Sequence, residues 1–426
     1  MSSVQAAARE ADVKIRPLPV PEPDLTPAEL LKRARALRPL LRATQDESDA
    51  RGHYSEEIHK KFMEAGFYRI LQPKLFGGYE FDYTTYYKVM LEISTGHPGA
   101  GWCLALGASH GAVVAAHWPA EAQVDFFGTD GHFIAPHSAP PGGKLTKVDG
   151  GYMVTGKWGY CSGIPYSTHL LGTSLLQKES GPPEMKVIVL PRKNYTIVDD
   201  WGGDATLGMA ASGSNSVTAE NVFVPEHHVS YGNALWCRPE EMADGTFGTR
   251  LHGNPMYLGR LMGPYHASLI TPVIGAARAA IDAFEEILTS RVNMAQPNVL
   301  RAHHFEGQRP FGEAVAMTDA AEAILVSACD RYMEYCHRWG RDGTPITVEE
   351  NLRLWTLEQQ AGKLAAEAVE LIWRSASSAE SKRGTKIQRY FRDVAMYRQH
   401  ISAQIQNFAV YVARTHFNQP VGMFGL

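Results

Sequence analysis

The chain contains no Asp, Glu, Lys or Arg between Ile93 and Ala120. An uncharged segment of this length is long enough to cross a membrane. If it does not cross one, the rest of the protein must bury it. The same segment holds three histidines, two prolines and five glycines, and histidines are rare in membrane spans. We therefore interpret 93–120 as buried core helices that lie close to a functional site.

Helix signals come first along the chain. Alternating prolines in residues 1–25 predict an extended arm. Thr26-Pro27-Ala28-Glu29 then has the order of a helix start, with a capping hydroxyl, a proline and a Glu three residues after the cap. Ser55 and Gly66 bracket a second helix. We expect a mainly helical domain over 26–125.

The apolar period changes to that of strands in residues 126–235. Lys144–Val148 and Tyr152–Thr155 alternate apolar and polar residues around an Asp-Gly-Gly turn, which predicts a hairpin. Strand-like runs at 170–176, 186–190 and 216–224 follow. We expect a middle antiparallel β-barrel or sandwich domain.

From residue 236 to the end the pattern predicts a C-terminal four-helix bundle. Thr347 and Glu350 form a capping-box pattern at the start of the third helix. The fold class is therefore α+β, without the strand–helix alternation of a Rossmann fold. The expected helices span 264–291, 313–339, 348–376 and 386–414.

Composition narrows the function. Lys and Arg number 41 and Asp and Glu 45, for a net charge of -4, and neither sign clusters, which argues against a nucleic-acid partner. Five scattered cysteines without a C-x-x-C pair suit free thiols in the cytoplasm, and we expect no metal site. Charged residues near the N-terminus argue against a secretion signal.

The order of helices, β block and helices, together with several motifs, resembles the acyl-CoA dehydrogenase fold. Within it the chain is similar to the oxygenase components of two-component, reduced-flavin-dependent monooxygenases, such as the hydroxyphenylacetate and steroid-ring hydroxylases. The motifs that carry the resemblance are Pro73-Lys-Leu-Phe-Gly77-Gly78, Gly101-Trp102 with His110, Ser138-Ala139-Pro140, Gly150-Gly151-Tyr-x-Val-x-Gly156-x-Trp158, Trp158-Gly-Tyr-Cys-Ser162-Gly163, Ser212-Gly-Ser-Asn215-Ser-Val217 and Asn254-Pro-Met-Tyr257.

One departure separates this chain from the dehydrogenases that it resembles. Those enzymes follow a late Arg-Asp pair with a Tyr-Glu-Gly segment whose glutamate removes a substrate proton. Here Arg392-Asp393 leads to His400, and no Glu follows Glu380. An imidazole suits the deprotonation or hydrogen bonding of a phenol-like hydroxyl.

The resemblance implies reduced FMN or FAD and O2 as cosubstrates, a C4a-hydroperoxide, a separate flavin reductase, a small aromatic (phenolic or polycyclic) substrate and a homotetramer. It implies the following sites: catalytic His110, His400 and Ser138; cofactor-binding Trp158, Ser162, Gly163, Ser212, Ser214, Asn215 and Arg291; and substrate-binding Trp102 and Tyr257.

Three alternatives remain open. Gly107-Ala-Ser109-His110-Gly111 matches the nucleophile elbow of serine hydrolases, although that elbow requires a mostly parallel sheet. An acyl-CoA dehydrogenase with a displaced base could use Asp282, Glu285 or Glu286, which a solvated helix face also explains. The third is a noncatalytic flavin-binding scaffold.

Overall fold

The computed structural model describes residues 13–128, 130–178, 180–230, 244–259, 262–294 and 296–421. The boundary expected near 235 and Cys237 lie outside these residues. The N-terminal helices begin where the capping residues predict: Thr26 Oγ1 accepts the Glu29 N–H at 3.2 Å, and Ser55 Oγ accepts the Ile58 N–H at 3.3 Å. These helices are α2 (Pro27–Ala43), α3 (Gln45–Arg51), α4 (Glu56–Glu64), α5 (Tyr83–Gly96), α6 (Pro98–His117) and α7 (Ala120–Phe127), with the 3-10 turn η1 (Phe67–Arg69).

The middle of the chain forms a six-stranded sheet with the order β4-β3-β1-β2-β6-β5. The predicted hairpin is present, with Leu145 opposite Val154. The sheet is mixed, however, because β1 and β3 run parallel, so the expectation of a wholly antiparallel module was wrong at this pair. The strands are β1 (His137–Val148), β2 (Gly151–Trp158), β3 (His169–Leu176), β4 (Glu184–Pro191), β5 (Thr196–Ile197) and β6 (Val217–Pro225).

The parallel pair follows from the path between β2 and β3. Residues 159–168 leave the end of β2 and reach the other side of β1 through the 3-10 turn η2 (Ile164–Tyr166), so β3 runs in the direction of β1. A two-residue turn cannot make such a crossing, which needs a longer connection. This crossing connection carries Ser162 and Gly163.

Long helices follow the sheet, as predicted, with one difference. The expected helix 386–414 is broken between Tyr397 and Ile405, and His400 lies at the break. The elements after β6 are η4 (Glu226–His228), α8 (Phe247–His252), η6 (Pro255–Leu258), α9 (Met262–Ser290), β7 (Val292–Asn293), β8 (Gln296–Leu300), η7 (Arg301–His303), α10 (Phe305–Asp342), α11 (Val348–Ala376), η8 (Ser378–Ser381), α12 (Lys386–Tyr397), η9 (Ile401–Ala403) and α13 (Ile405–His416).

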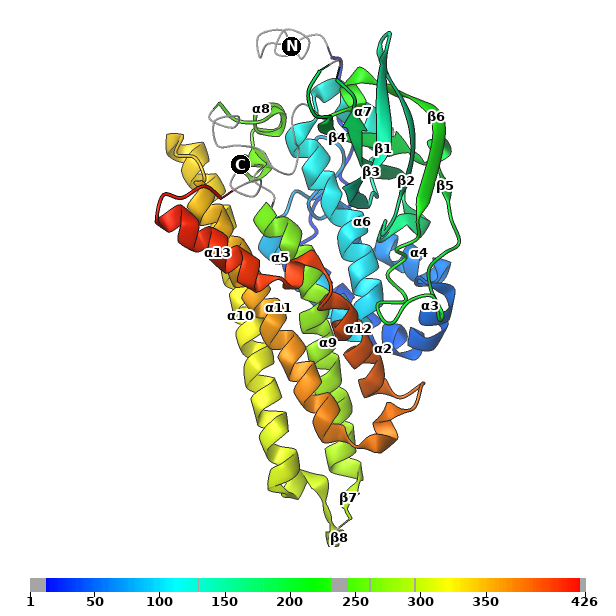
Figure 1. Ribbon diagram of the computed structural model, residues 1–426, viewed down its shortest axis with the longest axis vertical. Coiled ribbons are helices and arrows are strands. Elements are labelled where there is room, and N and C mark those ends of the chain that lie inside the picture. Colours follow the sequence, from blue (N-terminus) through cyan, green and yellow to red (C-terminus); the bar gives the residue numbers. More distant parts are fainter. Residues whose placement is uncertain are drawn as a thin grey trace.

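Helix α6 runs between the sheet and the helical bundle (Figure 1). It packs against α5 and α9, and every one of its residues is buried. Helices α6 and α9 are long and apolar enough to cross a membrane, but 100% of the apolar window of α6 and 83% of that of α9 lie inside the fold. As predicted, the uncharged segment forms core helices. Apolar residues of the N-terminal helices and the bundle form one continuous core, and the sheet has a smaller core of its own.

Candidate active site

The connection between β2 and β3 lies directly on α6. Gly163 at its turn has a φ of +92°, and a Cβ there would lie 2.7 Å from the carbonyl oxygen of Cys103 in α6. Glycine alone combines this backbone conformation with so close an approach. The Gly163 N–H donates to the carbonyl oxygen of Ser212 at 3.0 Å. Two loops that were predicted to bind a cofactor are thus held together beside α6.

Three serine hydroxyls and one indole form a buried hydrogen-bonded chain where these loops meet. Trp102 Nε1–H donates to Ser162 Oγ at 3.1 Å. Ser162 Oγ lies 2.7 Å from Ser214 Oγ, which lies 2.6 Å from Ser212 Oγ. The contacts between hydroxyls need only two of the three hydroxyl protons, so one remains to donate to a ligand, and the oxygens keep lone pairs. Such a chain fits the edge of a flavin ring, which presents both donors and acceptors.

His110, on α6, has its tautomer fixed by the main chain. Its Nδ1 lies 2.7 Å from the carbonyl oxygens of Leu106 and Ala135. Carbonyl oxygens only accept, so Nδ1 carries the proton and Nε2 is an acceptor. Nε2 is buried and has no protein partner among the described residues. Burial lowers the pKa of His110 to about 4, which keeps the ring neutral at pH 7.

His400 has the opposite polarity. Its Nδ1 accepts the main-chain N–H of Ser402 at 3.1 Å, so Nε2 carries the proton and is a donor. Burial lowers the pKa of His400 to about 4, so this ring is also neutral. Its ring meets that of Trp102 edge-on, with 5.7 Å between centroids. Through Trp102 the structure joins the predicted substrate-side histidine to the serine chain.

Two further rings beside His110 were not identified from the sequence. The His137 ring lies 5.9 Å from that of His110, and the Tyr265 ring lies 5.7 Å from His110 and 6.2 Å from His137. Burial lowers the pKa of His137 to about 3, and its Nδ1 has no protein partner among the described residues. The alternation of side chains along a strand could have identified His137. Ser138 was the predicted site residue, and its neighbour His137 must face the opposite side of β1.

The neighbour of Tyr265 extends this wall toward His400. His266 is buried, and burial followed by the nearby His400 lowers its pKa to about 3. Its Nδ1 has no protein partner among the described residues. The His266 ring packs on Trp355 with 4.6 Å between centroids. His266 is thus the fourth neutral imidazole of the site and lies, like His400, on its bundle side.

Ser138 points away from these rings. Its hydroxyl donates to the carbonyl oxygen of Gly159 at 3.0 Å, at the start of the connection that carries Ser162. It is buried, and its hydrogen bond braces that connection against β1. A catalytic contact of Ser138 stays a prediction.

Trp158 and Asn215 have partners on the sheet side. The Trp158 indole is fully buried in the core of the sheet, and its Nε1–H donates to the carbonyl oxygen of Thr173 at 2.8 Å. The Asn215 side chain donates to the carbonyl oxygen of Val198 at 3.0 Å. Their cofactor contacts remain predictions, and these hydrogen bonds serve the loop and the sheet.

Tyr257 and Arg291 do not join the serine and histidine groups. The Tyr257 hydroxyl donates to the carbonyl oxygen of Leu71 at 3.0 Å, and its ring packs on His252. Arg291 pairs with the buried Glu380 at 2.9 Å, at the β7 end of α9. A cofactor phosphate reached by Arg291 across a subunit contact stays a prediction.

The residues proposed for a serine hydrolase or a dehydrogenase base lie where they could not perform those reactions. Ser109 is inside α6, so the strand and sharp turn that a nucleophile elbow requires are absent there. Asp282 pairs with Arg42, and Glu286 pairs with Lys386 at 2.6 Å. Both carboxylates are about half exposed, with side-chain exposures of 47% and 60%, as the solvated face of a helix predicts.

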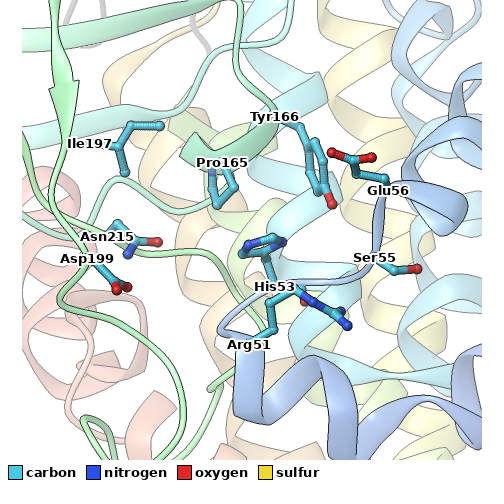
Figure 2. A pocket seen from close by; sticks show the side chains of 9 residues that line it. All are labelled: Arg51, His53, Ser55, Glu56, Pro165, Tyr166, Ile197, Asp199 and Asn215. Carbon is cyan, nitrogen blue, oxygen red and sulfur yellow. The ribbon is translucent and has the colours of Figure 1, made fainter.

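A separate pocket of about 590 Å³ is lined by residues 51–56 together with residues of the two loops (Figure 2). Of the predicted site residues only Asn215 lines it. Its charged residues have both signs, which gives it no clear preference for an anion or a cation. Its lining residues are Arg51, His53, Ser55, Glu56, Pro165, Tyr166, Ile197, Asp199 and Asn215.

Comparison with known proteins gives consistent matches. Family models for the acyl-CoA dehydrogenase N-terminal and C-terminal domains match residues 33–127 and 267–405. The oxygenase subunit HsaA of a flavin-dependent monooxygenase from Rhodococcus jostii is 28% identical over 92% of this chain and 99% of the relative. The oxygenase component of p-hydroxyphenylacetate 3-hydroxylase from Acinetobacter baumannii is 25% identical over 88% of this chain and 85% of the relative. The crystal structure of 3-HSA hydroxylase from Rhodococcus sp. RHA1 has a TM-score of 0.82 at 26% identity, covering 93% of this chain and 99% of that structure.

Proposed function

The chain belongs to the acyl-CoA dehydrogenase family and is the oxygenase component of a two-component flavin-dependent monooxygenase, and from this premise we propose that it hydroxylates a phenol held between two neutral histidines. The observation that carries the proposal is the opposite polarity of His110 and His400: one presents a lone pair and the other an N–H. A phenol hydroxyl is at once a donor and an acceptor, so it complements such a pair.

The serine chain would hold the cofactor. Ser162, Ser214 and Ser212 present hydroxyls that can donate to or accept from the polar edge of a flavin. Bound reduced flavin would supply the two electrons that activate O2, and one atom of that O2 would be transferred to the substrate while the other leaves as water. Trp102 fixes the orientation of Ser162 by donating its N–H, which leaves the hydroxyl proton free to turn toward a ligand or toward Ser214.

His110 is suited to accept a hydrogen bond more than to remove the proton outright. A phenol has a pKa near 10, whereas burial lowers that of His110 to about 4. Full proton transfer in the ground state would therefore cost roughly 8 kcal/mol, at about 1.36 kcal/mol for each unit of pKa difference. A hydrogen bond from the phenol to Nε2 still raises electron density on the ring as the C–O bond forms, and it fixes which ring carbon faces the oxidant.

His400 is suited to donate. With Nδ1 occupied by the Ser402 N–H, its Nε2–H can orient an oxygen atom of the substrate or of the oxidant. The hypothesis that His400 deprotonates the substrate is less consistent with this tautomer than the hypothesis that it orients a hydroxyl. An aligned donor of this kind typically contributes about 10²-fold or more to a rate.

The surrounding wall keeps water out. Every residue of α6 is buried, the rings of His110, His137 and Tyr265 lie 5.7–6.2 Å from one another, and Trp102 packs edge-on against His400. Exclusion of water protects a reactive oxygen species from wasteful breakdown. The low pKa values of the buried histidines have the same cause, because an imidazolium would be poorly solvated there.

The buried ring nitrogens without protein partners indicate a substrate with polar groups. These atoms are His110 Nε2, His137 Nδ1 and His266 Nδ1. An unpartnered buried nitrogen costs free energy unless the ligand satisfies it, so we infer a phenol whose hydroxyl meets His110 and that carries another polar group. The relatives' names support this class, since hydroxyphenylacetate is a phenol with a carboxylate.

The remaining features are proposals of the same kind. A separate flavin reductase delivers the cofactor, because the sequence contains no Gly-rich strand-to-helix loop for a nicotinamide dinucleotide. Assembly as a homotetramer and the use of FMN or FAD follow from the resemblance, and a location in the cytoplasm follows from the scattered free cysteines and the charged N-terminus.

Reconstitution tests the proposal. The purified chain is mixed with either FMN or FAD that a separate reductase and NADH keep reduced, then with O2 and a panel of substituted phenols. We expect catechol or hydroquinone products and slow NADH oxidation when the reductase is omitted. Rapid NADH oxidation by the chain alone would refute the two-component assignment. Anaerobic reduction of bound oxidised flavin by an acyl-CoA would show that the chain is a dehydrogenase.

A further inference from the structure

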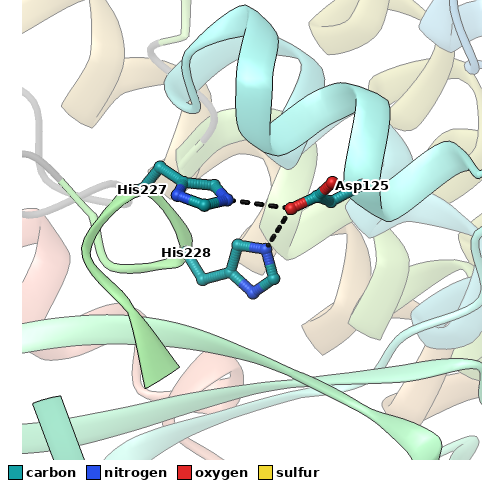
Figure 3. A group of neighbouring side chains, drawn as sticks. All are labelled: Asp125, His227 and His228. Carbon is teal, nitrogen blue, oxygen red and sulfur yellow. Dashed lines mark hydrogen bonds and ion pairs between the residues drawn. The ribbon is translucent and has the colours of Figure 1, made fainter. Parts of the chain in front are cut away.

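Two consecutive histidines and an aspartate, none of them part of the serine chain, meet at one point (Figure 3). His227 Nε2 lies 2.8 Å and His228 Nε2 lies 3.0 Å from the same oxygen, Oδ2 of Asp125. The three ligand atoms all lie within 4.8 Å of one another. Asp125 is on α7 and the histidines are on η4, so the group joins a helix before the sheet to the turn that follows β6.

A second carboxylate supports this group. Glu121 is one helical turn before Asp125 on α7, and its Oε1 lies 3.8 Å from Nδ1 of His227. His227 thus has its Nε2 directed at Asp125 and its Nδ1 directed at a carboxylate. Histidines that bind metals usually donate their second N–H to a carboxylate or carbonyl oxygen. At 3.8 Å the exposed Glu121 carboxylate is beyond hydrogen-bond distance, and a small rotation of its side chain would bring it within reach.

The geometry is close to that of a tetrahedral metal site. With metal–ligand bonds of about 2.0–2.1 Å, tetrahedral ligand atoms lie about 3.3 Å apart. The two distances to Asp125 Oδ2, 2.8 and 3.0 Å, are shorter than that spacing by about 0.3–0.5 Å, so the three side chains would have to move apart only slightly to admit an ion. The fourth position would be open to water, since Asp125 is 49% exposed.

We propose that Asp125, His227 and His228 bind one divalent transition-metal ion of the zinc type. Two imidazoles and one carboxylate are the ligands that Zn²⁺ and its neighbours prefer, whereas Ca²⁺ and Mg²⁺ prefer oxygen ligands throughout. The carboxylates of Asp125 and Glu121 balance the charge of the ion. On binding, each neutral imidazole shifts its proton from Nε2 to Nδ1 and gives the freed Nε2 lone pair to the metal, and the Nδ1–H of His227 then faces the carboxylate of Glu121.

The same residues also form a hydrogen-bonded group without metal, in which both Nε2–H groups donate to Asp125. This arrangement holds the pKa of Asp125 well below its usual range. The His228 ring packs on Phe126 with 4.8 Å between centroids, which keeps it in place in either state. We therefore infer a structural ion that ties α7 to η4, with no part in oxygen transfer.

Titration of the untagged, chelator-treated chain with ZnCl₂ by calorimetry tests the site. We expect one ion per chain and a higher Tm in its presence. Asp125→Asn and His227→Ala should each weaken binding by about 100-fold or more, and Glu121→Gln by about 10-fold, since it acts through His227. His303→Ala, at an exposed histidine on η7, is the matched control and should bind as the wild type does.

Three results would overturn the proposal. The first is the absence of saturable binding at 0.1 mM zinc, a concentration at which adventitious surface sites begin to fill. The second is unchanged binding in both Asp125→Asn and Glu121→Gln. The third is an equal loss of binding in His303→Ala. Glu121 is 54% exposed, so Glu121→Gln leaves the fold intact and keeps the test decisive if the other variants unfold.

Discussion

The hydrogen-bonding polarity of the two histidines that we propose for the active site is set by main-chain groups. Two carbonyl oxygens hold the proton of His110 on Nδ1, and one N–H holds that of His400 on Nε2. A change of side chains elsewhere leaves these main-chain contacts in place. The sequence motifs singled out both histidines and the serines of the two loops as candidate site residues. They could not predict the tautomers of the histidines, because that of His110 depends partly on Ala135, 25 positions away, and that of His400 depends on a local turn.

Loss of the His400 N–H donor should uncouple O2 consumption from hydroxylation of the substrate. In His400→Ala we expect O2 still to be consumed but to appear mainly as H2O2, with the product yield lower by about 10²-fold. His400→Gln, which keeps an N–H group, should recover part of that yield if donation is the role, and none if proton removal is. The ratio of product to H2O2 in single-turnover experiments is the measurement. Full coupling in His400→Ala would show that the ring has no role in the transfer.

Two buried serines provide a matched pair of variants. Ser162 is in the hydroxyl chain, whereas Ser109 is within α6. We expect Ser162→Ala to raise the share of O2 released as H2O2, because a hydrogen bond to the cofactor is lost, and Ser109→Ala to leave that share unchanged. Assays of product and H2O2 in both variants measure how much of the consumed O2 each one wastes. Stoichiometric labelling of Ser109 by a fluorophosphonate would contradict the assignment and support a hydrolase.

Elements with local signals were predicted well, and those fixed by distant contacts were not. The capped starts of α2, α4 and α11 and the hairpin of β1 and β2 agree with the sequence patterns. The break before α13 was missed because neither glycine nor proline marks it. His400 is extended there, with a ψ of 150°, and caps η9 with its own side chain. A helical apolar period continues on both sides, so periodicity alone cannot reveal such a break.

The crossing connection on α6 should be intolerant of any side chain at its turn. Gly163→Ala forces a Cβ into a left-handed conformation and against a main-chain oxygen, so we expect the free energy of unfolding to fall by about 3 kcal/mol. Gly181→Ala is the control, since its φ of +89° is similar but nothing lies within 4 Å, and it should cost only about 1 kcal/mol. Urea denaturation measures both. Equal losses would show that close packing on α6 contributes nothing.

At the scale of the whole molecule, buried neutral histidines should make stability depend on pH. Each has a folded pKa below its unfolded value near 6.5, so the unfolded chain binds protons that the folded chain does not. The contribution of these histidines to stability should therefore be full above pH 6.5 and fall as the pH drops from 6.5 toward 4. The buried ones are His97, His137 and His266, with a pKa of about 3, and His110, His117 and His169, with a pKa of about 4; the half-buried His59, His252 and His400 also have a pKa of about 4.

Thermal unfolding at several pH values checks this expectation. The Tm should be nearly constant between pH 7 and 8 and should decrease steadily below pH 6.5. Substitution of one of these rings by an apolar residue is a poor control, because it also changes packing. Proton uptake on unfolding, measured by calorimetry in two buffers of different ionisation enthalpy, is the direct test. A Tm that stays flat down to pH 4.5 would contradict the buried neutral state.

Burial of α6 on all sides has a consequence for synthesis on the ribosome. Its covering helix α9 begins at residue 262, some 145 residues after α6 ends at His117. At about 5–20 residues per second the nascent chain carries an uncovered apolar helix for roughly 7–30 s before that partner emerges. Exposed apolar segments of this kind promote aggregation, so we expect a ribosome-associated chaperone to bind the nascent chain at α6. Yield of soluble protein should therefore respond more to chaperone supply and slower growth than to any substitution on the surface.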